Sequence, residues 1–278
     1  MHIFKTNDKV IVKHSGLLYS SPEWNWDSFI NREGLHNAVL NDIQNLPANP
    51  ALSADLENPG APIGNQEIWA SGVTYLRSMD ARMEESKDAG GGDFYSRVYN
   101  AERPEIFFKS PGYRAVGTGG TVRIRKDSKW NVPEPELVLF ICSTGAIEGY
   151  MIGNDMSSRD IEGENPLYLP QAKSYDGAAA VGPCLYVPGA PISHDTKIQL
   201  EILRGDEQMF ADEILISRMK RAHQELAKYL FMEMSFPVGA YLMTGTGIVP
   251  PDSFTLNYGD VINITISNIG TLTNRVGE

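Results

Sequence analysis

Two glutamates, Glu134 and Glu136, flank a single proline directly before an apolar run in the stretch NVPEPELVLF. Side chains of an extended segment alternate between its two faces, so both carboxylates are expected on the same side. Like charges this close raise each other's pKa and repel unless a cation lies between them. A third carboxylate, Asp155, ends another apolar run in YMIGNDMSSRDIE. The three residues are predicted to ligate a hard divalent ion: Mg²⁺ is expected, with Mn²⁺ or Ca²⁺ as alternatives.

On the spacing of Glu134 and Glu136 alone, a pair of solvent-exposed glutamates in a proline-rich turn is an equally good interpretation. Asp155 favours the metal site, because a strand running beside the first could deliver it to the same place. A zinc-type site is not expected, since the histidines all lie outside these stretches. They are His2, His14, His36, His194 and His223.

The segments that must position these carboxylates are mostly strands. The continuously apolar run Leu137 to Ile141 predicts a strand covered on both faces, and residues 143–145 (Ser-Thr-Gly) supply a turn into the next strand. Apolar residues at helical spacing predict a helix from Arg218 to Met232. Alternation of apolar and polar residues predicts further half-buried strands at 122–125, 198–202 and 262–266.

The length of the chain and a cluster of prolines and glycines suggest two domains. A chain of 278 residues can form one large domain or a main domain with a small appendage. Prolines and glycines crowd residues 47–64, which predicts a linker. We therefore expect a small amino-terminal domain at residues 1–62 and a catalytic domain at residues 66–278.

Composition excludes several classes of partner. The net charge of −11 opposes binding to nucleic acid and to anionic lipid. Cys142 and Cys184 lie far apart in apolar sequence, which indicates buried thiols in a reducing compartment. The amino terminus lacks the apolar block of a secretory signal, and no window approaches the ~18 apolar residues of a membrane span. A cytoplasmic enzyme acting on a small molecule is expected.

Five ordered stretches carry a resemblance to a known family. They are VPEPELVLF, GYMIGNDMSSRDIE, LPQAKSYDGAAAVGP, MTGTGIVP and GDVINITISNIGTLTNRV. In this order, over about residues 66 to 276, they resemble the fumarylacetoacetate hydrolase superfamily, and five ordered motifs are far more specific than any one of them. The resemblance implies an α+β, β-rich fold, the mixed β-roll of that superfamily, usually as a homodimer. It also implies that Glu134, Glu136 and Asp155 hold the metal.

The resemblance assigns roles to residues around the metal. Lys173 stands at the position of the family's active-site lysine, and Arg159 and Glu162 lie in the segment that lines the family's pocket, so these three are the expected catalytic residues. The expected substrate-binding residues are polar groups of neighbouring segments, namely Lys109, Ser110, Gln171, Tyr168, Thr246 and Arg82. Alternatives stay open: Arg159 could pair with Asp160, and Arg82 with acidic residues of its own helix.

Departures from the family pattern bear on the reaction. Hydrolases and many decarboxylases of the superfamily carry a histidine, often with a glutamate three residues later, on a mobile helix. In GVTYLRSMDARMEES the corresponding places fall on Asp80 and Met83, although the adjacent Glu84 and Glu85 could restore one acid. An aspartate with an ordinary pKa near 4 is a poor general base at neutral pH, so C–C hydrolysis is less supported. The glycines at 90–92 predict a hinge after this helix.

The connector GENPLYLPQAK resembles the branch of 2-keto-3-deoxy-pentonate (arabinonate or xylonate) dehydratases. We therefore predict a Mg²⁺-dependent hydro-lyase that gives 2,5-dioxopentanoate. Lys173, or as second choice Glu162, would remove a C3 proton, and Glu162 or a water that it holds would help the C4 hydroxyl to leave. The alternatives are a fumarylacetoacetate- or acylpyruvate-type C–C hydrolase, an oxaloacetate decarboxylase, and a non-catalytic binder of 2-keto acids.

Overall fold

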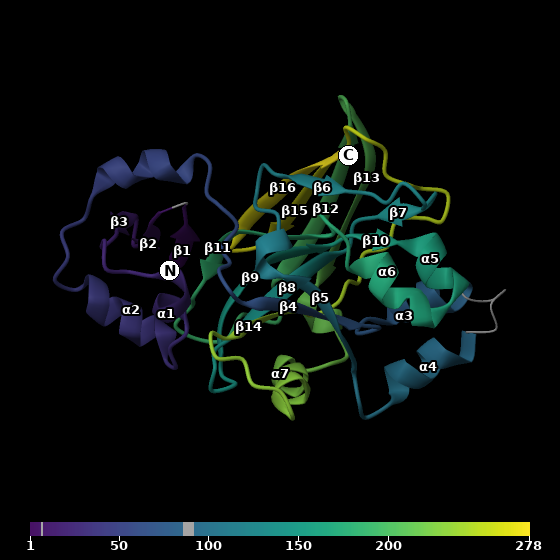
Figure 1. Ribbon diagram of the computed structural model, residues 1–278, viewed down its shortest axis with the longest axis horizontal. Coiled ribbons are helices and arrows are strands. Elements are labelled where there is room, and N and C mark those ends of the chain that lie inside the picture. The colour runs from purple at the N-terminus through teal and green to yellow at the C-terminus, as the bar shows by residue number, and fades with distance from the viewer. Residues whose placement is uncertain (7, 86–91) are drawn as a thin grey trace.

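The computed structural model describes residues 1–6, 8–85 and 92–278 (Figure 1). Gly90 and Gly91 of the predicted hinge lie outside the described residues. The largest element is a nine-stranded sheet. Its strands, in spatial order, are β3 (Leu17–Tyr19), β2 (Val10–His14), β1 (His2–Lys5), β11 (Ala179–Tyr186), β9 (Ile147–Asp155), β8 (Pro135–Ile141), β14 (Ala240–Met243), β4 (Glu67–Gly72) and β5 (Glu105–Pro111).

A second sheet has five strands and packs against the first. Its strands, in spatial order, are β13 (Glu207–Leu215), β12 (Lys197–Arg204), β15 (Val261–Ile266), β16 (Gly270–Gly277) and β6 (Thr121–Arg123). A short ribbon joins β10 (Ser157–Ser158) to β7 (Asn131–Val132). The expected α+β, strand-rich fold class is confirmed.

Helices gather at the two ends of the larger sheet and beside it (Figure 1). The α-helices are α1 (Trp26–Ile30), α2 (Leu35–Ile43), α3 (Leu76–Glu85), α4 (Gly92–Asn100), α5 (Arg159–Glu164), α6 (Leu169–Lys173) and α7 (His223–Phe231). The 3₁₀ helices are η1 (Pro50–Leu56), η2 (Gly112–Arg114), η3 (Pro166–Tyr168) and η4 (Ile216–Arg218). None of the described helices has the length and apolar character that a bilayer crossing requires.

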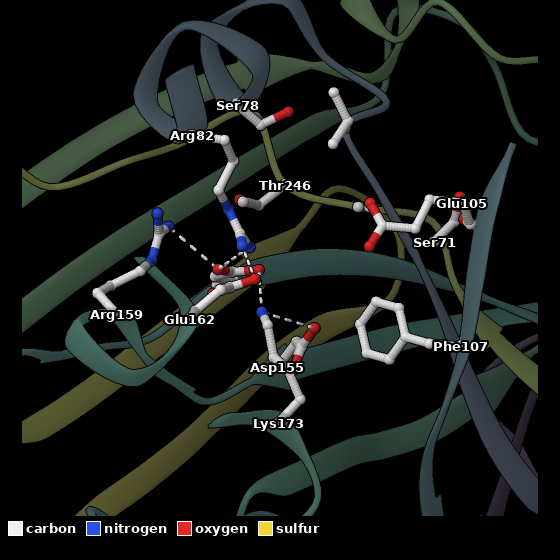
Figure 2. Close-up of a pocket in the computed structure, with 14 residues that line it drawn as sticks. Ser71, Ser78, Arg82, Glu105, Phe107, Asp155, Arg159, Glu162, Lys173 and Thr246 are labelled. Atoms are coloured by element: carbon white, nitrogen blue, oxygen red, sulfur yellow. Dashed lines mark hydrogen bonds and ion pairs between the residues drawn. The ribbon is translucent and has the colours of Figure 1, made fainter. Parts of the chain in front are cut away.

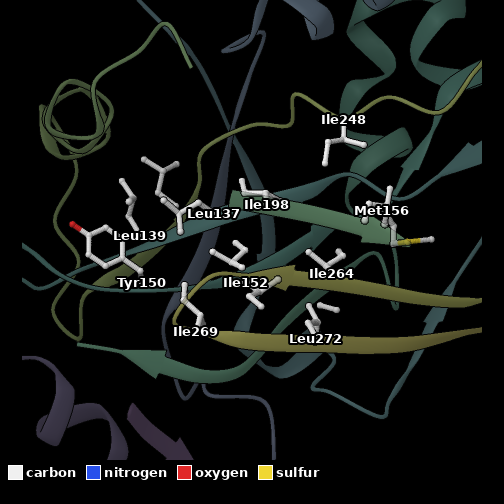
Figure 3. Close-up of a cluster of buried hydrophobic side chains, with 14 of the residues drawn as sticks. Leu137, Leu139, Tyr150, Ile152, Met156, Ile198, Ile248, Ile264, Ile269 and Leu272 are labelled. Carbon is white, nitrogen blue, oxygen red and sulfur yellow. The ribbon is translucent and has the colours of Figure 1, made fainter. Parts of the chain in front are cut away.

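Strand β8 is buried on both faces, as its unbroken apolar sequence predicted. Leu137 and Leu139 face the five-stranded sheet, where they join Ile264 of β15 in one apolar core (Figure 3). Val138 and Phe140 point the other way, into a second apolar cluster that also contains residues of the first two strands. Residues 143–145 turn the chain into the antiparallel β9, with Gly145 at a φ of +88°.

The amino-terminal segment extends the main sheet. Strand β1 pairs antiparallel with β11, placing His2 opposite Tyr186 and Ile3 opposite Leu185. The proline-rich stretch predicted as a linker contains the 3₁₀ helix η1. The division into domains at residues 1–62 and 66–278 stays a prediction.

Two predicted boundaries need correction. Helix α7 begins at His223 and not at Arg218, because the chain before it is held in extended contact: Met219 forms a bridge with Tyr75, and Lys220 N donates to Thr74 O at 2.8 Å. The strand predicted at 122–125 ends at Arg123. The strands predicted at 198–202 and 262–266 are confirmed within β12 and β15.

Glu148 of β9 caps helix α2, whose own N-cap residue is a glycine without a side chain. Its carboxylate accepts hydrogen bonds from the backbone N–H groups of Gly34 and Leu35, both at 2.8 Å. We predict that Glu148→Ala lowers the free energy of unfolding by about 1–2 kcal/mol, as for other charged helix caps. Urea denaturation followed by circular dichroism would measure it. Glu23→Ala, at an exposed position, is the control, and an equal loss in both variants would contradict the capping role.

Candidate active site

The three predicted metal ligands meet where β8 begins and β9 ends. The antiparallel register places Pro135 opposite Asn154, so Asp155 arrives beside Glu134, and Asp155 N donates to Glu134 O at 3.0 Å. Glu136 is the second residue of β8. Each of the three carboxylates is buried and offers an oxygen, and these oxygens all lie within 4.8 Å of one another. The predicted convergence of Glu134, Glu136 and Asp155 is confirmed.

Cations from three helices surround the carboxylates (Figure 2). Lys173, the last residue of α6, donates from Nζ to Glu134 Oε2 at 2.8 Å and to Asp155 Oδ2 at 3.1 Å. Arg159 of α5 and Arg82 of α3 both approach Glu134 Oε1, at 3.0 and 3.3 Å. Arg82 also pairs with Glu162, whose other oxygen accepts from Ser157 Oγ at 2.9 Å.

The surrounding charges and burial shift the pKa values of Glu134 and Glu136 in opposite directions. Burial disfavours the ionised form of Glu134, but the charges of Lys173, Arg159 and Arg82 outweigh it and hold the pKa of Glu134 well below its usual range. Burial, reinforced by the carboxylates of Asp155 and Glu134, raises the pKa of Glu136 well above its usual range. Burial and the two neighbouring carboxylates therefore favour the neutral form of Glu136.

The residues present fit a divalent cation. The Oδ1 atom of Asp155 is buried, and the ammonium group of Lys109 lies 2.5 Å from it. An ion held between the three groups would offset their mutual repulsion, which adds to the effect of burial on the pKa of Glu136. Oxygen-only ligands with carboxylate charge suit Mg²⁺ or Mn²⁺. The cluster can therefore hold such a metal.

A glycine fixes the third side of the cluster. Gly245 N donates to Glu136 Oε2 at 2.6 Å, in a backbone conformation with a φ of +94°. A Cβ atom at this position would lie 2.1 Å from Thr74 Oγ1, so no other residue fits without a shift. The next residue, Thr246, lines the pocket beside the carboxylates.

Five of the predicted catalytic and substrate-binding residues line one pocket with Glu134 and Asp155. They are Arg82, Arg159, Glu162, Lys173 and Thr246. Figure 2 shows the two arginines and Glu162 on one side of this pocket, and Ser71, Glu105 and Phe107 on the other. One side is therefore rich in cations and the other carries a single carboxyl group.

The remaining predicted substrate-binding residues do not reach the pocket. Tyr168 is 38% exposed, and Gln171 faces solvent on α6 because it lies two residues, ~200° of helix, from the inward-facing Lys173. Ser110 donates to Pro111 O at 3.0 Å. Lys109 is fully buried on the far side of Asp155. Contact of these four residues with substrate is not supported by where they lie.

Glu105 is an ionisable pocket residue that the sequence did not reveal. It stands at the start of β5 opposite Gly72 of β4, where a Cβ atom would lie 2.2 Å from Glu105 Oε2. Burial raises the pKa of Glu105; Glu134 and Asp155 add to this, while Arg82 and Lys173 oppose it. Glu105 can therefore keep its proton at a higher pH than a free glutamate. One glutamate among 35 acidic residues carries no signal by itself, and the glycine that makes room for it lies on another strand.

Helix α3 brings an arginine into the pocket and not a base. Asp80, the residue that the family resemblance assigned to the histidine place, is exposed. Arg82, two residues on, lines the pocket and contacts Glu134. Among the described residues of α3, none that lines the pocket could activate water as an imidazole does.

Comparisons with known proteins agree with this geometry. A family profile described as "Fumarylacetoacetate (FAA) hydrolase C-terminal" matches residues 68–277. A probable 2-keto-3-deoxyxylonate dehydratase of Haloferax volcanii is 46% identical over 216 residues, covering 77% of this chain and 73% of the relative. A 2-dehydro-3-deoxy-D-arabinonate dehydratase of Saccharolobus solfataricus is 43% identical over 215 residues, covering 76% and 72%.

A solved structure covers nearly the whole chain. It is a 2-keto-3-deoxy-D-arabinonate dehydratase complexed with magnesium and 2,5-dioxopentanoate. The likeness has a TM-score of 0.83 at 31% identity and spans 99% of this chain and 98% of the other. The similarity therefore includes the amino-terminal segment, which lies outside the family profile.

The contrast between the two glutamates leads to a prediction about Glu136→Gln. Without a divalent ion the substitution removes a group that resists ionisation, so thermal stability in EDTA should stay within about 1 kcal/mol of the parent protein. The stabilisation by added Mg²⁺ should vanish, because one of three ligands is lost. Melting curves with EDTA and with Mg²⁺ would measure both effects. An undiminished Mg²⁺ response would show that Glu136 is not a ligand.

Proposed function

The chain belongs to the fumarylacetoacetate hydrolase family, and within it we propose a Mg²⁺-dependent dehydratase of 2-keto-3-deoxy sugar acids. The expected product is 2,5-dioxopentanoate from 2-keto-3-deoxy-D-arabinonate or -xylonate. The names of the two relatives at 46% and 43% identity support this substrate class. The observation that carries the proposal is the pocket itself: a carboxylate cluster, a buried lysine and a glutamate of raised pKa, with no histidine among the described residues that line it.

Mg²⁺ bound by Glu134, Glu136 and Asp155 would polarise the 2-oxo group of the substrate and make its C3 protons more acidic. The guanidinium groups of Arg82 and Arg159 lie beside this cluster and suit a substrate carboxylate. Both now pair with Glu134, so they are already inside the pocket before an anion arrives.

Lys173 is the candidate general base for a C3 proton. Its amine bridges Glu134 and Asp155 and is 1% exposed, so bulk water has little access to it. It must be neutral to accept the proton. Glu162 is the second candidate, but Ser157 and Arg82 already occupy its oxygens.

Glu105 is the candidate general acid. Its raised pKa lets it deliver a proton to the C4 oxygen as the C4–O bond breaks and water leaves. Loss of one C3 proton and the C4 hydroxyl gives a C3–C4 double bond, and proton shifts from C5 then give the aldehyde. Net, one water is lost. Glu105 thus takes the role that the sequence had assigned to Glu162 or a water.

We also propose a cytoplasmic homodimer. The family resemblance supports the dimer, as do large apolar side chains at the surface such as Tyr113 and Leu167, which are 81% and 82% exposed. Light scattering would have to show twice the mass of the chain. The two cysteines are free and buried, which suits a reducing compartment.

The function is tested by incubating purified protein and Mg²⁺ with the two 2-keto-3-deoxy-pentonates, and in parallel with acetylpyruvate and oxaloacetate. We expect 2,5-dioxopentanoate from at least one sugar acid and no turnover in EDTA. A Glu134→Ala variant should be inactive, which separates an enzyme from a binder of keto acids. Rapid pyruvate formation without any dioxopentanoate would reject the dehydratase in favour of a hydrolase or decarboxylase.

We predict that Glu105 determines how kcat depends on pH. If it acts as the acid, kcat must fall as pH rises through its pKa, because the ionised form cannot donate. Glu105→Gln should lower kcat by about 10²–10⁴-fold and remove this basic limb. Glu67→Gln, at an exposed glutamate of neighbouring β4, is the control. An unchanged basic limb in Glu105→Gln would assign it to another group.

A further inference from the structure

We propose that Lys109 is a positioning residue, which holds the metal ligand Asp155 and the backbone of Lys173 in register from behind the pocket. The proposal rests on the proposed function only for its activity measurement. Lys109 is 0% exposed, in a chain region that contributes Phe107 to the pocket but not Lys109 itself. Its charge must therefore serve neighbouring protein groups.

All three N–H bonds of the ammonium group have a partner. Lys109 Nζ lies 2.5 Å from Asp155 Oδ1 and 3.0 Å from the carbonyl oxygen of Met156, and it donates to the carbonyl oxygen of Lys173. The first two partners belong to the end of β9 and the residue after it. The third is the final residue of α6. One side chain thus ties a ligand to the backbone of the candidate base.

A β-bulge in strand β5 sets the direction of the Lys109 side chain. In the pairing of β5 with β4, Ser110 lies opposite Ile68 and Phe108 opposite Trp69, so Lys109 is the extra residue of a β-bulge. Bulges redirect a side chain and are frequent beside active sites. A regular strand would give Lys109 a partner on β4 and a different direction.

The contact also links parts of the sheet that do not pair. Strand β5 is at one edge of the nine-stranded sheet, and β8, β14 and β4 separate it from β9. Ser174, directly after α6, donates from Oγ to Phe108 O at 3.0 Å, next to Lys109. The edge strand and α6 are therefore held together at two adjacent points, and Lys109 extends this link to Asp155.

Charge and position make opposite predictions for metal binding. If Lys109 acted only through its charge, its removal would strengthen binding of a cation, because a positive group 2.5 Å from a ligand oxygen opposes the ion. If Lys109 positions Asp155, its removal should weaken binding, as for other groups that orient metal ligands, by about 10–100-fold. The sign of the change separates the two roles.

The experiment is Mg²⁺ titration by calorimetry of the purified protein and of Lys109→Met, which keeps the length of the stem and loses all three donors. We expect at least about tenfold weaker Mg²⁺ binding. Lys109→Gln keeps two hydrogen-bond donors without a charge. Its affinity for Mg²⁺ should lie between the affinities of the parent protein and of Lys109→Met. Lys197→Met removes an exposed lysine paired with Glu213 and is the matched control for charge. At saturating Mg²⁺, kcat of Lys109→Met should also fall at least about tenfold, with KM within about threefold, because Lys173 loses its support.

The Mg²⁺ titrations of the Lys109 variants can contradict the positioning role in two ways. Equal or tighter Mg²⁺ binding in a folded Lys109→Met protein overturns the proposal, and so does failure of both Lys109 variants to fold, which would make the residue purely structural. If the parent protein binds Mg²⁺ but does not convert the sugar acids, the proposed function fails while the calorimetric comparison still tests Lys109.

Discussion

Repulsion among buried carboxylates is the constraint on which the rest of this site depends. Glu134, Glu136 and Asp155 are buried and present oxygens within 4.8 Å of one another. Such a cluster is costly unless positive charge is supplied from outside it. The chain supplies part of that charge from four separate elements, through Arg82, Lys109, Arg159 and Lys173. Burial and the two neighbouring carboxylates still raise the pKa of Glu136, and a divalent ion between the three groups would supply further positive charge.

The fold follows from the need to bring these cations to one point. The register of the β8–β9 hairpin brings the three carboxylates together. The compensating groups come from α5 and α6, which follow β9 in the chain, and from α3 and the edge strand β5, which lie further away in sequence. The strongly apolar second face of β8 anchors the hairpin between two cores, so the carboxylates cannot relax apart. The rigid strands therefore keep the like charges together. The short helices supply cations that offset the repulsion between them.

The parts of this arrangement that could be predicted are those governed by local periodicity. Alternation placed Glu134 and Glu136 on one side, and the apolar run of β8 indicated burial on both faces. Resemblance to a family supplied Lys173 and Arg159. Helix phase decided against Gln171, and a bulge set by the pairing of two strands decided the position of Lys109. Glu105 depends on a glycine across the sheet, a long-range relation that no single stretch of sequence displays.

The pocket contains glutamates that differ in role although they share one chemistry. Glu134 touches three cations and stays ionised, as a metal ligand must. Glu105 lies on the side where burial dominates and its nearest charges partly cancel, so its pKa rises. Titratable groups whose environments push their pKa values apart are the mark of an acid–base assignment. A hydrolase of this scaffold would need a base that activates water from the α3 side, where this chain has an arginine. The division of labour between Glu134, Glu105 and Lys173 suits the removal of a proton and a hydroxyl from adjacent carbons, with no water molecule to activate.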